Sequence, residues 1–386
     1  LSPAVTHARA GQATMVDSDG LLKWAPHNLI PYSNDLTASG WLNNDSTVTL
    51  NAGVSPDGTS NANKFIPNIN STTHNTYVQL GLQTSASKHS FSVYVASAGY
   101  GFATVSNLGS SSNDYYSVII DLSNGTKTAT YSSGTQTDKT CTVEAVGSFY
   151  RVTISGDGER YYLVGASDTG TYTPSTYGFK SFAGDGTSGI LIYGAHVYRS
   201  NLGGMANNPA QSTGFETYVP TTGSAVYLPR VGHHVYNGSA WVNEGVLHES
   251  EARTNLVTYS NEFTHSSWVK NATITPNDAV SPDGTSNASK FSFGGTGYFQ
   301  FNSISTVGQT YTVSAWVKSY DGTDEAFQLY AQNGDFNQDF IATSEWQRFS
   351  LTYTSTDADA NHGDGIARPT SNIPALLHVY GIQIEA

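Results

Sequence analysis

The chain has very little of three things: cysteine, charge and long apolar runs. Cys141 is the one cysteine among 386 residues, so an intrachain disulfide is excluded, and we expect this side chain to act as a small buried apolar group. No run approaches the ~18 apolar residues of a membrane-spanning helix. Charged residues amount to 12% of the chain, without a basic cluster, so we expect neither a nucleic acid nor an anionic membrane as partner.

Windows rich in alanine, leucine, glutamate and lysine, which favour stable helices, are also missing. The chain has instead 24 tyrosines, 38 glycines and many threonines, serines and asparagines. Aromatic and β-branched residues between turn-forming residues are typical of strands. The composition therefore predicts an all-β protein with a polar, mostly uncharged surface. Its net charge of −13 favours neutral over acidic glycans as ligands.

One sequence pattern occurs twice. Residues 28–41 recur at 255–268, with 8 of 14 positions identical. The octapeptide S-P-D-G-T-S-N-A at 55–62 recurs unchanged at 281–288. Two such copies predict two large domains. We expect the following organisation: a lead-in hairpin at 1–27, a first domain at 28–200, a connector with a β-hairpin at 201–254 and a second domain at 255–386.

Within both copies, apolar residues alternate with polar ones. The segments that align are 77–80 with 298–301, 91–97 with 313–319, 150–154 with 347–351 and 192–198 with 379–385. Short strands of period two, separated by turn residues, are typical of antiparallel sandwiches. Asn-Gly at 237–238 and Asp-Gly at 19–20 indicate tight hairpins in the connector and the lead-in. The prediction is two antiparallel jelly-roll β-sandwich domains, each preceded by a small β-hairpin unit.

The repeated motifs resemble a known family. They are an opening N-L-hydrophobic-x-Y-S-N, a mid-domain S-P-D-G-T and a closing Y-G-x-Q, with E-A-R-T-N-L at 251–256 and Y-V-P-T-T-G at 218–223. Together they resemble the jelly-roll modules of phage head-spike and tail-fibre proteins, over nearly the whole chain. The resemblance implies carbohydrate-binding-module-like sandwiches on the surface of a virion. The first copy departs from the closing pattern, with His196 and Tyr198 in place of Gln383 and Glu385.

Alternation also sorts the side chains of each strand into inward and outward sets. The inward set of the second copy is Phe299, Phe301, Val313, Ala315, Val317, Phe349, Leu351, Ile382 and Ile384. Sugars stack on aromatic rings and form hydrogen bonds with amide and guanidinium groups. We therefore expect glycan contacts at ten outward residues: Tyr77, Gln79, Tyr94, Arg151 and His196 in the first copy, and Tyr298, Gln300, Trp316, Arg348 and Gln383 in the second.

A second interpretation of the outward aromatic residues stays open. They could pack beneath a loop, beneath the small hairpin unit or against a neighbouring subunit instead of binding sugar. Trp41 and Trp268 occupy the same place in both copies, and we expect them to pack in the core or at its edge. The Pro-Asp-Gly of the repeated octapeptide suits a turn, so we interpret both octapeptides as structural.

The resemblance also implies a structural calcium ion, because related sandwiches often join their first and last strands through one. Glu262 and Glu385 would supply oxygen ligands in the second copy. Tyr198 replaces the second carboxylate in the first copy, so we expect a weaker site there or none. His233 and His234 are adjacent on a predicted strand and point to opposite faces, so we do not expect them to chelate one metal ion. We expect no other cofactor.

Catalytic motifs are missing from the sequence. It contains no nucleophile elbow, zinc-protease, P-loop or dinucleotide-binding motif. Asp357, Asp359 and Asp364 lie in a glycine-containing acidic segment, which we interpret as a solvated loop rather than a glycosidase pair. We therefore predict a non-enzymatic virion fibre or spike protein that binds host cell-surface polysaccharide. Oligomerisation, expected as a trimer, would raise its avidity. The alternatives are a structural head-decoration or tail component that binds other virion proteins, and a polysaccharide depolymerase.

Overall fold

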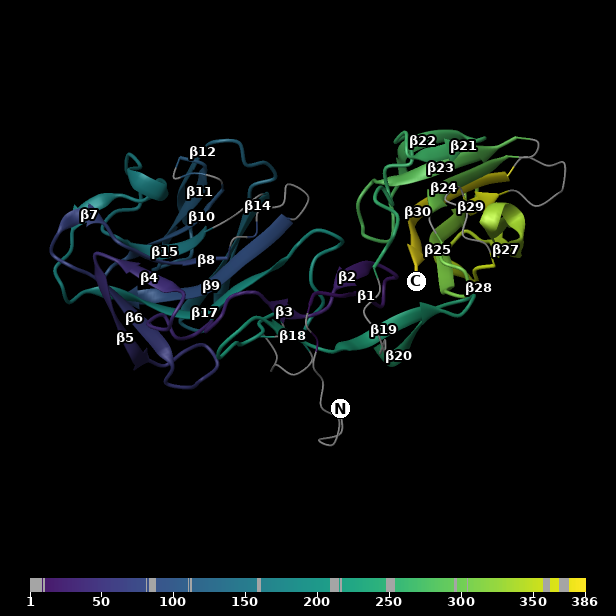
Figure 1. Ribbon diagram of the computed structural model, residues 1–386. Helices are drawn as coiled ribbons and strands as arrows, with labels where there is room; N and C mark the ends of the chain where they lie inside the picture. Colours follow the sequence, from purple (N-terminus) through teal and green to yellow (C-terminus); the bar gives the residue numbers. More distant parts are fainter. Residues whose placement is uncertain are drawn as a thin grey trace. The chain divides into compact units, whose positions relative to one another are not determined.

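The structure is a computed structural model (Figure 1). It describes the following residues: 9, 11–80, 82, 88–109, 111, 113–157, 161–208, 215, 217–247, 254–294, 297–303, 305–356, 362–367 and 375–386. Across this part of the chain the regular elements are thirty strands and two short 3-10 turns, η1 (Thr176–Gly178) and η2 (Gln332–Gly334). The all-β prediction is confirmed. No helix of the described part is long and apolar enough to cross a membrane.

The chain folds into two compact units. The first consists of Leu1–Met15 and Lys23–Val231, and the second of Val16–Leu22 and Gly232–Ala386. Each unit contains one copy of the repeated pattern. The residues of the predicted lead-in and connector are divided between the two units, because Val16–Leu22 and Gly232–Leu247 belong to the second.

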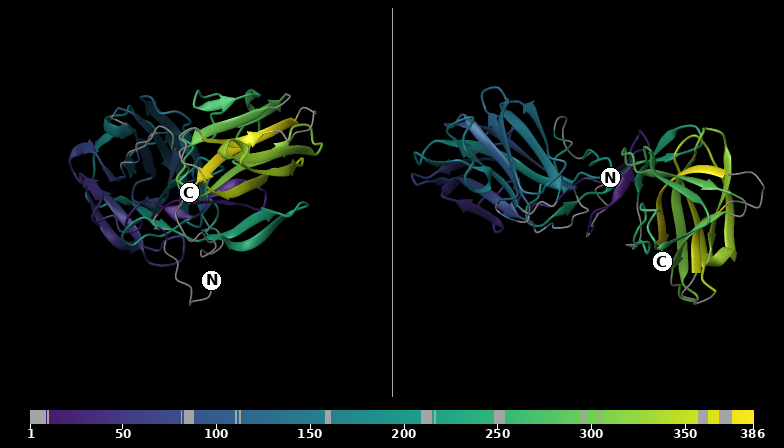
Figure 2. Two further views of the ribbon diagram at one scale, coloured as in Figure 1. Left: turned by 45° about the vertical axis from the view of Figure 1, so that its right-hand side comes forward. Right: turned by 90° about the horizontal axis from the view of Figure 1, so that it is seen from above.

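The first unit is a sandwich of two six-stranded antiparallel sheets (Figures 1 and 2). Sheet A has the order β12 (Lys127–Ser133), β11 (Tyr115–Asp121), β10 (Phe102–Leu108), β15 (Tyr161–Ser167), β8 (Asn75–Gln79), β4 (Trp41–Asn44). Sheet B has the order β13 (Thr140–Val146), β14 (Phe149–Asp157), β9 (Lys88–Ala98), β17 (Gly189–Arg199), β6 (Ala62–Pro67), β5 (Ser46–Gly53). The first copy exceeds the second by β12 and β13, which add one edge strand to each sheet.

The second unit has the same plan with five strands in each sheet. Sheet C has the order β21 (Trp268–Lys270), β24 (Tyr298–Ser303), β29 (His362–Ala367), β26 (Glu325–Ala331), β27 (Phe336–Ala342). Sheet D has the order β22 (Thr273–Ala279), β23 (Ala288–Phe293), β30 (Ala375–Glu385), β25 (Thr310–Ser319), β28 (Gln347–Thr354). The aligned segments of the two copies therefore occupy equivalent strands, since β8, β9, β14 and β17 correspond to β24, β25, β28 and β30.

Four short strand pairs complete the described fold. They are β1 (Thr14–Val16) with β2 (Leu22–Trp24), β19 (Arg230–Tyr236) with β20 (Trp241–Leu247), β3 (His27–Asn28) with β18 (Val226–Tyr227), and β7 (Ser71–Thr73) with β16 (Ser181–Ala183). The first two are the hairpins predicted from Asp-Gly and Asn-Gly. Their turns are closed by backbone hydrogen bonds from Asp17 N to Leu21 O (2.9 Å) and from Asn237 N to Ala240 O (3.1 Å).

Each sandwich has its own apolar core between its two sheets. In the second unit, every residue of the predicted inward set lies in this core or packs against it. Val313, Val317 and Ile384 are fully buried there. Trp41 and Trp268 are buried in the two cores, and their indole Nε1 atoms donate to the backbone carbonyls of Tyr32 and Tyr259 at 3.1 Å in both copies. The period-two reading of the strands and the packing prediction for both tryptophans are confirmed.

The closing strand of each sandwich contains one extra residue, a β-bulge. Gly194 in β17 and Gly381 in β30 have φ values of 63° and 62°, and the register with the neighbouring strand shifts at both places. Strict alternation would place Val379 and Ile382 on opposite faces of sheet D. The bulge returns Ile382 to the core, so that both are fully buried.

The repeated motifs hold this bulge in place. Asn261 in the opening motif accepts a hydrogen bond from the backbone N–H of Gly381 at 2.8 Å. Asn255 accepts from the backbone N–H of Ile384 at 3.1 Å. From the octapeptide, the Asp283 carboxylate accepts from the Tyr380 hydroxyl at 3.1 Å and from Thr285 N–H at 2.8 Å. The first copy repeats these bonds with Asn34, Asn28 and Asp57. The structural interpretation of the octapeptide is confirmed.

A glycine substitution tests the bulge. Gly381→Ala places a Cβ on a left-handed backbone, and we expect it to destabilise the second unit by about 1–2 kcal/mol. Gly294→Ala is the matched control, since its Cβ would meet nothing within 4 Å and its φ is ordinary. Urea unfolding of the full chain, followed by tryptophan fluorescence, measures both. Equal stability of the two variants would show that the bulge does not require glycine.

Candidate functional site

The ten predicted glycan-binding residues lie on two different faces of each sandwich. Tyr77 and Gln79 are on β8 of sheet A, and Tyr298 and Gln300 are on β24 of sheet C. The other six belong to sheets B and D, which form the opposite layers: Tyr94, Arg151, His196, Trp316, Arg348 and Gln383. The structure therefore does not bring the ten residues together into one site per copy.

The outer faces of sheets B and D are covered at the two predicted aromatic residues, Tyr94 and Trp316. Tyr94 is 1% exposed and packs against Phe215 and Tyr218, which follow the first copy in sequence. Trp316 is 5% exposed and packs with Val16 and Trp241. The expectation that both rings are open to a sugar is wrong, because residues outside the repeats cover them. The alternative interpretation, that outward aromatic residues pack inside the protein, is correct for Tyr94 and Trp316.

Arg151 and His196 are buried on the same face of the first unit. Arg151 is 8% exposed and lies 3.5 Å from the Glu144 carboxylate. His196 is 0% exposed, and its Nε2 donates to the backbone carbonyl of His27 at 2.8 Å. Neither side chain is available to a sugar, so the prediction is wrong for both.

Arg348 and Gln383 differ from their counterparts in the first copy, because they keep contact with solvent. The Arg348 guanidinium donates to the Gln383 side-chain carbonyl and to Ser314 Oγ, the latter at 3.0 Å. The two residues form a polar strip across β28, β25 and β30, next to the covered Trp316. Their assignment as glycan ligands stays a prediction.

The outer face of sheet A carries a cluster of partly exposed tyrosines. This tyrosine cluster consists of Tyr77, Tyr115, Tyr161 and Tyr177, which pack against buried Leu108, Leu163 and Phe179. The rings of Tyr77 and Tyr161 meet edge to face, with centroids 5.9 Å apart. Exposed Gln79 lies opposite Tyr161 in the strand pairing. Burial, with Tyr177 and Tyr161 nearby, raises the pKa of Tyr77, so its hydroxyl stays protonated.

The equivalent face of sheet C carries amides as well as aromatic rings. This Tyr-Gln face consists of the partly exposed Tyr298, Gln300 and Gln328 on β24 and β26, with the buried Tyr330 (5% exposed) beside Gln300. The Tyr330 hydroxyl donates to Gln300 Oε1 at 2.8 Å, and Gln300 Nε2 donates to Asn302 Oδ1 at 3.0 Å. Both ends of the Gln300 amide are therefore oriented. An added Cβ at Gly363 would lie 2.2 Å from this amide, so the glycine provides the room that the amide occupies.

Both copies thus keep a tyrosine and a glutamine two residues apart on the outer face of one sheet. The neighbouring edge strand carries an exposed aliphatic side chain in each copy. Leu42 (52% exposed) lies opposite Tyr77, and Val269 (37% exposed) lies opposite Gln300. Rings, amides and apolar edges side by side can contact the C–H faces and hydroxyls of a sugar. Alternation identified the tyrosine and glutamine of each pair. It missed Tyr115, Tyr161, Tyr177 and Tyr330, which come from strands and a loop that the repeat does not align.

Within the described part of the chain, Glu262 and Glu385, the predicted calcium ligands, do not belong to a group of three or more possible ligand side chains. Among the described residues, no three His, Cys, Asp or Glu side chains lie close enough together to hold a metal ion. The calcium ion therefore stays a prediction for these two carboxylates. His233 and His234 have separate partners, since His233 Nδ1 accepts from Val16 N–H (3.1 Å) and His234 Nδ1 lies 2.8 Å from Gly232 O.

Asp364 corrects one of the expectations about the acidic segment. It is fully buried on β29 instead of lying in a solvated loop, and its carboxylate accepts from Gln332 N–H at 3.0 Å and from the Tyr353 hydroxyl at 3.2 Å. Asp357 and Asp359 lie outside the described residues. Cys141 packs against the first core from β13, as expected of a small apolar group, but it is half-buried rather than buried. Burial raises its thiol pKa to about 11.

Comparisons with known proteins find similarity in structure only. No family model and no curated protein matches the chain. The tandem CBM22-1–CBM22-2 domain of Paenibacillus barcinonensis Xyn10C is similar over 99% of this chain and 100% of its own, at 10% identity and a TM-score of 0.25. The enzymatically active domain of bacteriophage CBA120 tailspike protein 4 is similar over 34% of this chain and 21% of its own, at 12% identity and a TM-score of 0.26. At these values the likenesses assign neither an activity nor a ligand.

The buried state of Trp316 predicts the effect of its removal. Trp316→Ala leaves a cavity between Val16, Tyr380 and Trp241, and we expect it to destabilise the second unit by about 3–5 kcal/mol. Tyr298→Ala removes a partly exposed ring and should cost less than about 1 kcal/mol. Differential scanning calorimetry of both variants makes the comparison. If Trp316→Ala leaves the transition of the second unit in place, the indole is not a packing residue.

Two buried histidines predict a dependence of stability on pH. Burial lowers the pKa of His27 to about 4, with Arg9 and Arg199 adding to the effect, and lowers that of His196 to about 3. An unfolded histidine titrates near 6.5, so the unfolded chain binds more protons below that pH and stability falls as the pH decreases from 6.5 towards 4. His27 alone should cost roughly 3 kcal/mol over this range.

A glutamine variant isolates this contribution. His27 accepts from Arg199 N–H at Nε2 (3.0 Å), while its Nδ1 lies 2.7 Å from Ala25 O. His27→Gln can form both bonds without titrating, so we expect it to weaken the pH dependence of the melting temperature of the first unit. His234→Gln, at a half-buried histidine, serves as the control. An unchanged slope for His27→Gln contradicts the assignment.

Proposed function

We propose that the chain binds carbohydrate without catalysis on the outer faces of sheets A and C. The observation that carries the proposal is the Tyr-x-Gln pair that both copies present on equivalent strands, Tyr77 with Gln79 and Tyr298 with Gln300. A sugar ring can stack on the partly exposed tyrosine while its hydroxyls bond to the adjacent amide. Next to the pair, the partly exposed Tyr115, Tyr161 and Tyr177 of the first copy and Gln328 of the second extend the contact over neighbouring strands, which suits a chain of sugars better than a single ring.

The charge of the protein supports an uncharged glycan as the ligand. The chain carries a net charge of −13, and the side chains of the Tyr-Gln face are themselves neutral. Hydrogen bonds between neutral partners are individually weak, so affinity for each face would be low, and several faces acting on one polysaccharide would raise it. Within this proposal, the chain is a fibre or spike protein of a virion, and the glycan is host cell-surface polysaccharide. A trimer would supply the several faces that avidity requires. The motif resemblance is what supports the viral assignment.

A second candidate is a structural role in assembly. Leu42 and Val269 favour it, because exposed aliphatic side chains on short edge strands also suit the packing of a neighbouring subunit. Under this alternative, the tyrosines of sheets A and C would be buried by other virion proteins. The two candidates predict opposite effects of the same substitution.

Alanine substitutions at both tyrosines distinguish them. Tyr77→Ala with Tyr298→Ala removes the stacking ring from each copy. We expect the affinity of each face for an uncharged oligosaccharide, identified on a glycan array, to fall about five- to tenfold, since a ring contact contributes about 1–1.5 kcal/mol. Tyr320→Ala, at a 41% exposed tyrosine beyond sheet D, is the matched control. Isothermal titration calorimetry measures affinity, and light scattering measures the oligomeric state.

The outcomes separate the three possible roles. Loss of binding with an unchanged oligomer supports the carbohydrate faces. Dissociation of the oligomer by the double variant, without a glycan that binds the native chain, supports assembly. New reducing ends after incubation of the native chain with a bound polysaccharide would show depolymerase activity and overturn the non-catalytic part of the proposal.

A further inference from the structure

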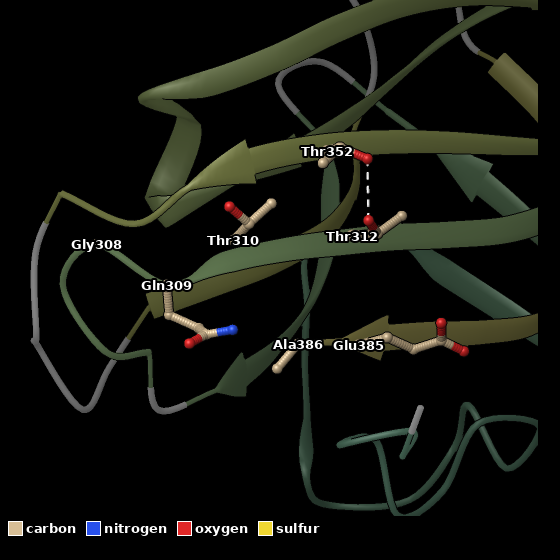
Figure 3. Close-up of a pocket in the computed structure, with 7 residues that line it drawn as sticks. All are labelled: Gly308, Gln309, Thr310, Thr312, Thr352, Glu385 and Ala386. Atoms are coloured by element: carbon tan, nitrogen blue, oxygen red, sulfur yellow. Dashed lines mark hydrogen bonds between the residues drawn. The ribbon is translucent and has the colours of Figure 1, made fainter. Parts of the chain in front are cut away.

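A polar hollow opens on the outer face of sheet D, away from the Tyr-Gln face. It has a volume of about 420 Å³, within the range of small-molecule sites, and lies where β25 begins and β30 ends (Figure 3). Its lining consists of Gly308, Gln309, Thr310, Thr312, Thr352, Glu385 and Ala386. No aromatic residue is among the seven, so a ligand there would be held by hydrogen bonds rather than by stacking.

The floor of the hollow is set by strand pairing. Thr312 lies opposite Thr352 on one side and Glu385 on the other. The hydroxyls of Thr312 and Thr352 bond to each other at 2.9 Å, as Figure 3 shows. Alternate residues of these strands, such as Val313 and Ile384, are fully buried in the core. The side chains of Thr310, Thr312, Thr352 and Glu385 are therefore fixed on a packed sheet, while Gly308, Gln309 and Ala386 lie outside its strands.

The polar groups of the lining match a ligand rich in hydroxyls. Each threonine hydroxyl has one donor and two acceptor positions, so the Thr312–Thr352 bond leaves further positions for a ligand. Glu385 is half-buried and can accept two hydrogen bonds from neighbouring hydroxyls or from an ammonium group. Glu385 is also the one charged side chain among the seven. A cationic or neutral ligand is therefore favoured, and a carboxylate or sulfate is disfavoured.

The first copy shows that this hollow is not required by the fold. The strand register aligns Thr312, Thr352 and Glu385 with Ser90, Ser155 and Tyr198. Ser90 and Ser155 are 5% exposed, and Tyr198 has no carboxylate. Two of the three positions are thus covered in the first copy and the third, half-buried Tyr198, is not acidic, whereas all three are accessible in the second copy.

We propose that this hollow is a second ligand site, specific to the second unit, that binds a hydroxyl-rich sugar and prefers an amino sugar. Glu385 pairs with the protonated amine, and the threonine hydroxyls bond to the ring hydroxyls. The proposal does not depend on the Tyr-x-Gln faces, because those belong to sheets A and C.

Three β-1,4-linked trisaccharides that differ in charge test the proposal on the full chain. They are the trisaccharides of glucosamine, glucose and glucuronic acid, titrated to 10 mM and followed by saturation-transfer NMR and calorimetry. We expect affinity to decrease in that order. Glu385→Gln should lower affinity for the glucosamine trisaccharide about tenfold and leave that for the glucose trisaccharide within twofold. Thr312→Val should weaken both, whereas Thr130→Val, at an exposed strand threonine of the first unit, should weaken neither.

Several results would overturn the proposal. One is the absence of binding by all three trisaccharides to the native chain. Another is an unchanged preference for the amino sugar in Glu385→Gln, with melting temperature confirming that the variant is folded. A third is loss of binding in the Tyr77→Ala, Tyr298→Ala double variant, which would assign the trisaccharides to the Tyr-x-Gln faces. If the double variant still binds the trisaccharides, the result supports the site at Glu385, even where the test of the carbohydrate faces of sheets A and C is negative.

Discussion

The fold of each sandwich depends on one extra residue in its closing strand. Without the bulge at Gly381, the two-residue period of β30 would turn Ile382 and Ile384 towards solvent and Gln383 into the core. The asparagines of the opening motif bond to backbone N–H groups on and beyond this bulge, and the octapeptide aspartate holds the tyrosine before it. Three sequence motifs far apart in the chain therefore act on a single point of the backbone, which explains why they recur together in both copies.

This constraint also decides what the closing strand presents on its outer side. Before the bulge, Tyr193 and Tyr380 point outward and lie beside the covered residues Tyr94 and Trp316. Beyond it, the outward positions are His196 with Tyr198 in one copy and Gln383 with Glu385 in the other. The aromatic half of the face is packed by segments outside the repeats in both units. In the other half, His196, Ser90 and Ser155 are buried in the first unit, whereas Gln383, Thr312 and Thr352 contact solvent in the second. The two copies therefore share a scaffold but differ in surface.

Alternation in the sequence predicted the cores and the outward direction of the candidate residues, because both follow from local geometry. It could not show which outward side chains are covered, since Trp316 is packed by Val16 and Trp241, which lie 300 and 75 positions away and belong to no repeat. It also could not assign outward residues to one of two opposite sheets. Asp364 shows a further limit: a glycine-rich acidic stretch has the composition of a loop, yet hydrogen bonds from Gln332 and Tyr353 allow its carboxylate to lie in the interior.

Comparing the two copies within this one chain helps to distinguish residues that maintain the fold from residues that could bind a ligand. Most positions that both copies share, such as the asparagines, the octapeptide and the bulge glycine, have the same bonding partner in each. Tyr-x-Gln is a different case, because its surroundings differ: tyrosines and a loop in the first unit, amides in the second. The pair recurs on a partly exposed outer face, but two residues earlier on the strand in the second copy, because Trp41 lies opposite Val78 and Trp268 opposite Phe301. Neither the core nor the bulge explains a recurrence that is shifted in register. It is the expected result if both faces contact similar ligands, whereas the hollow at Glu385 would arise where only one copy acquired a new partner.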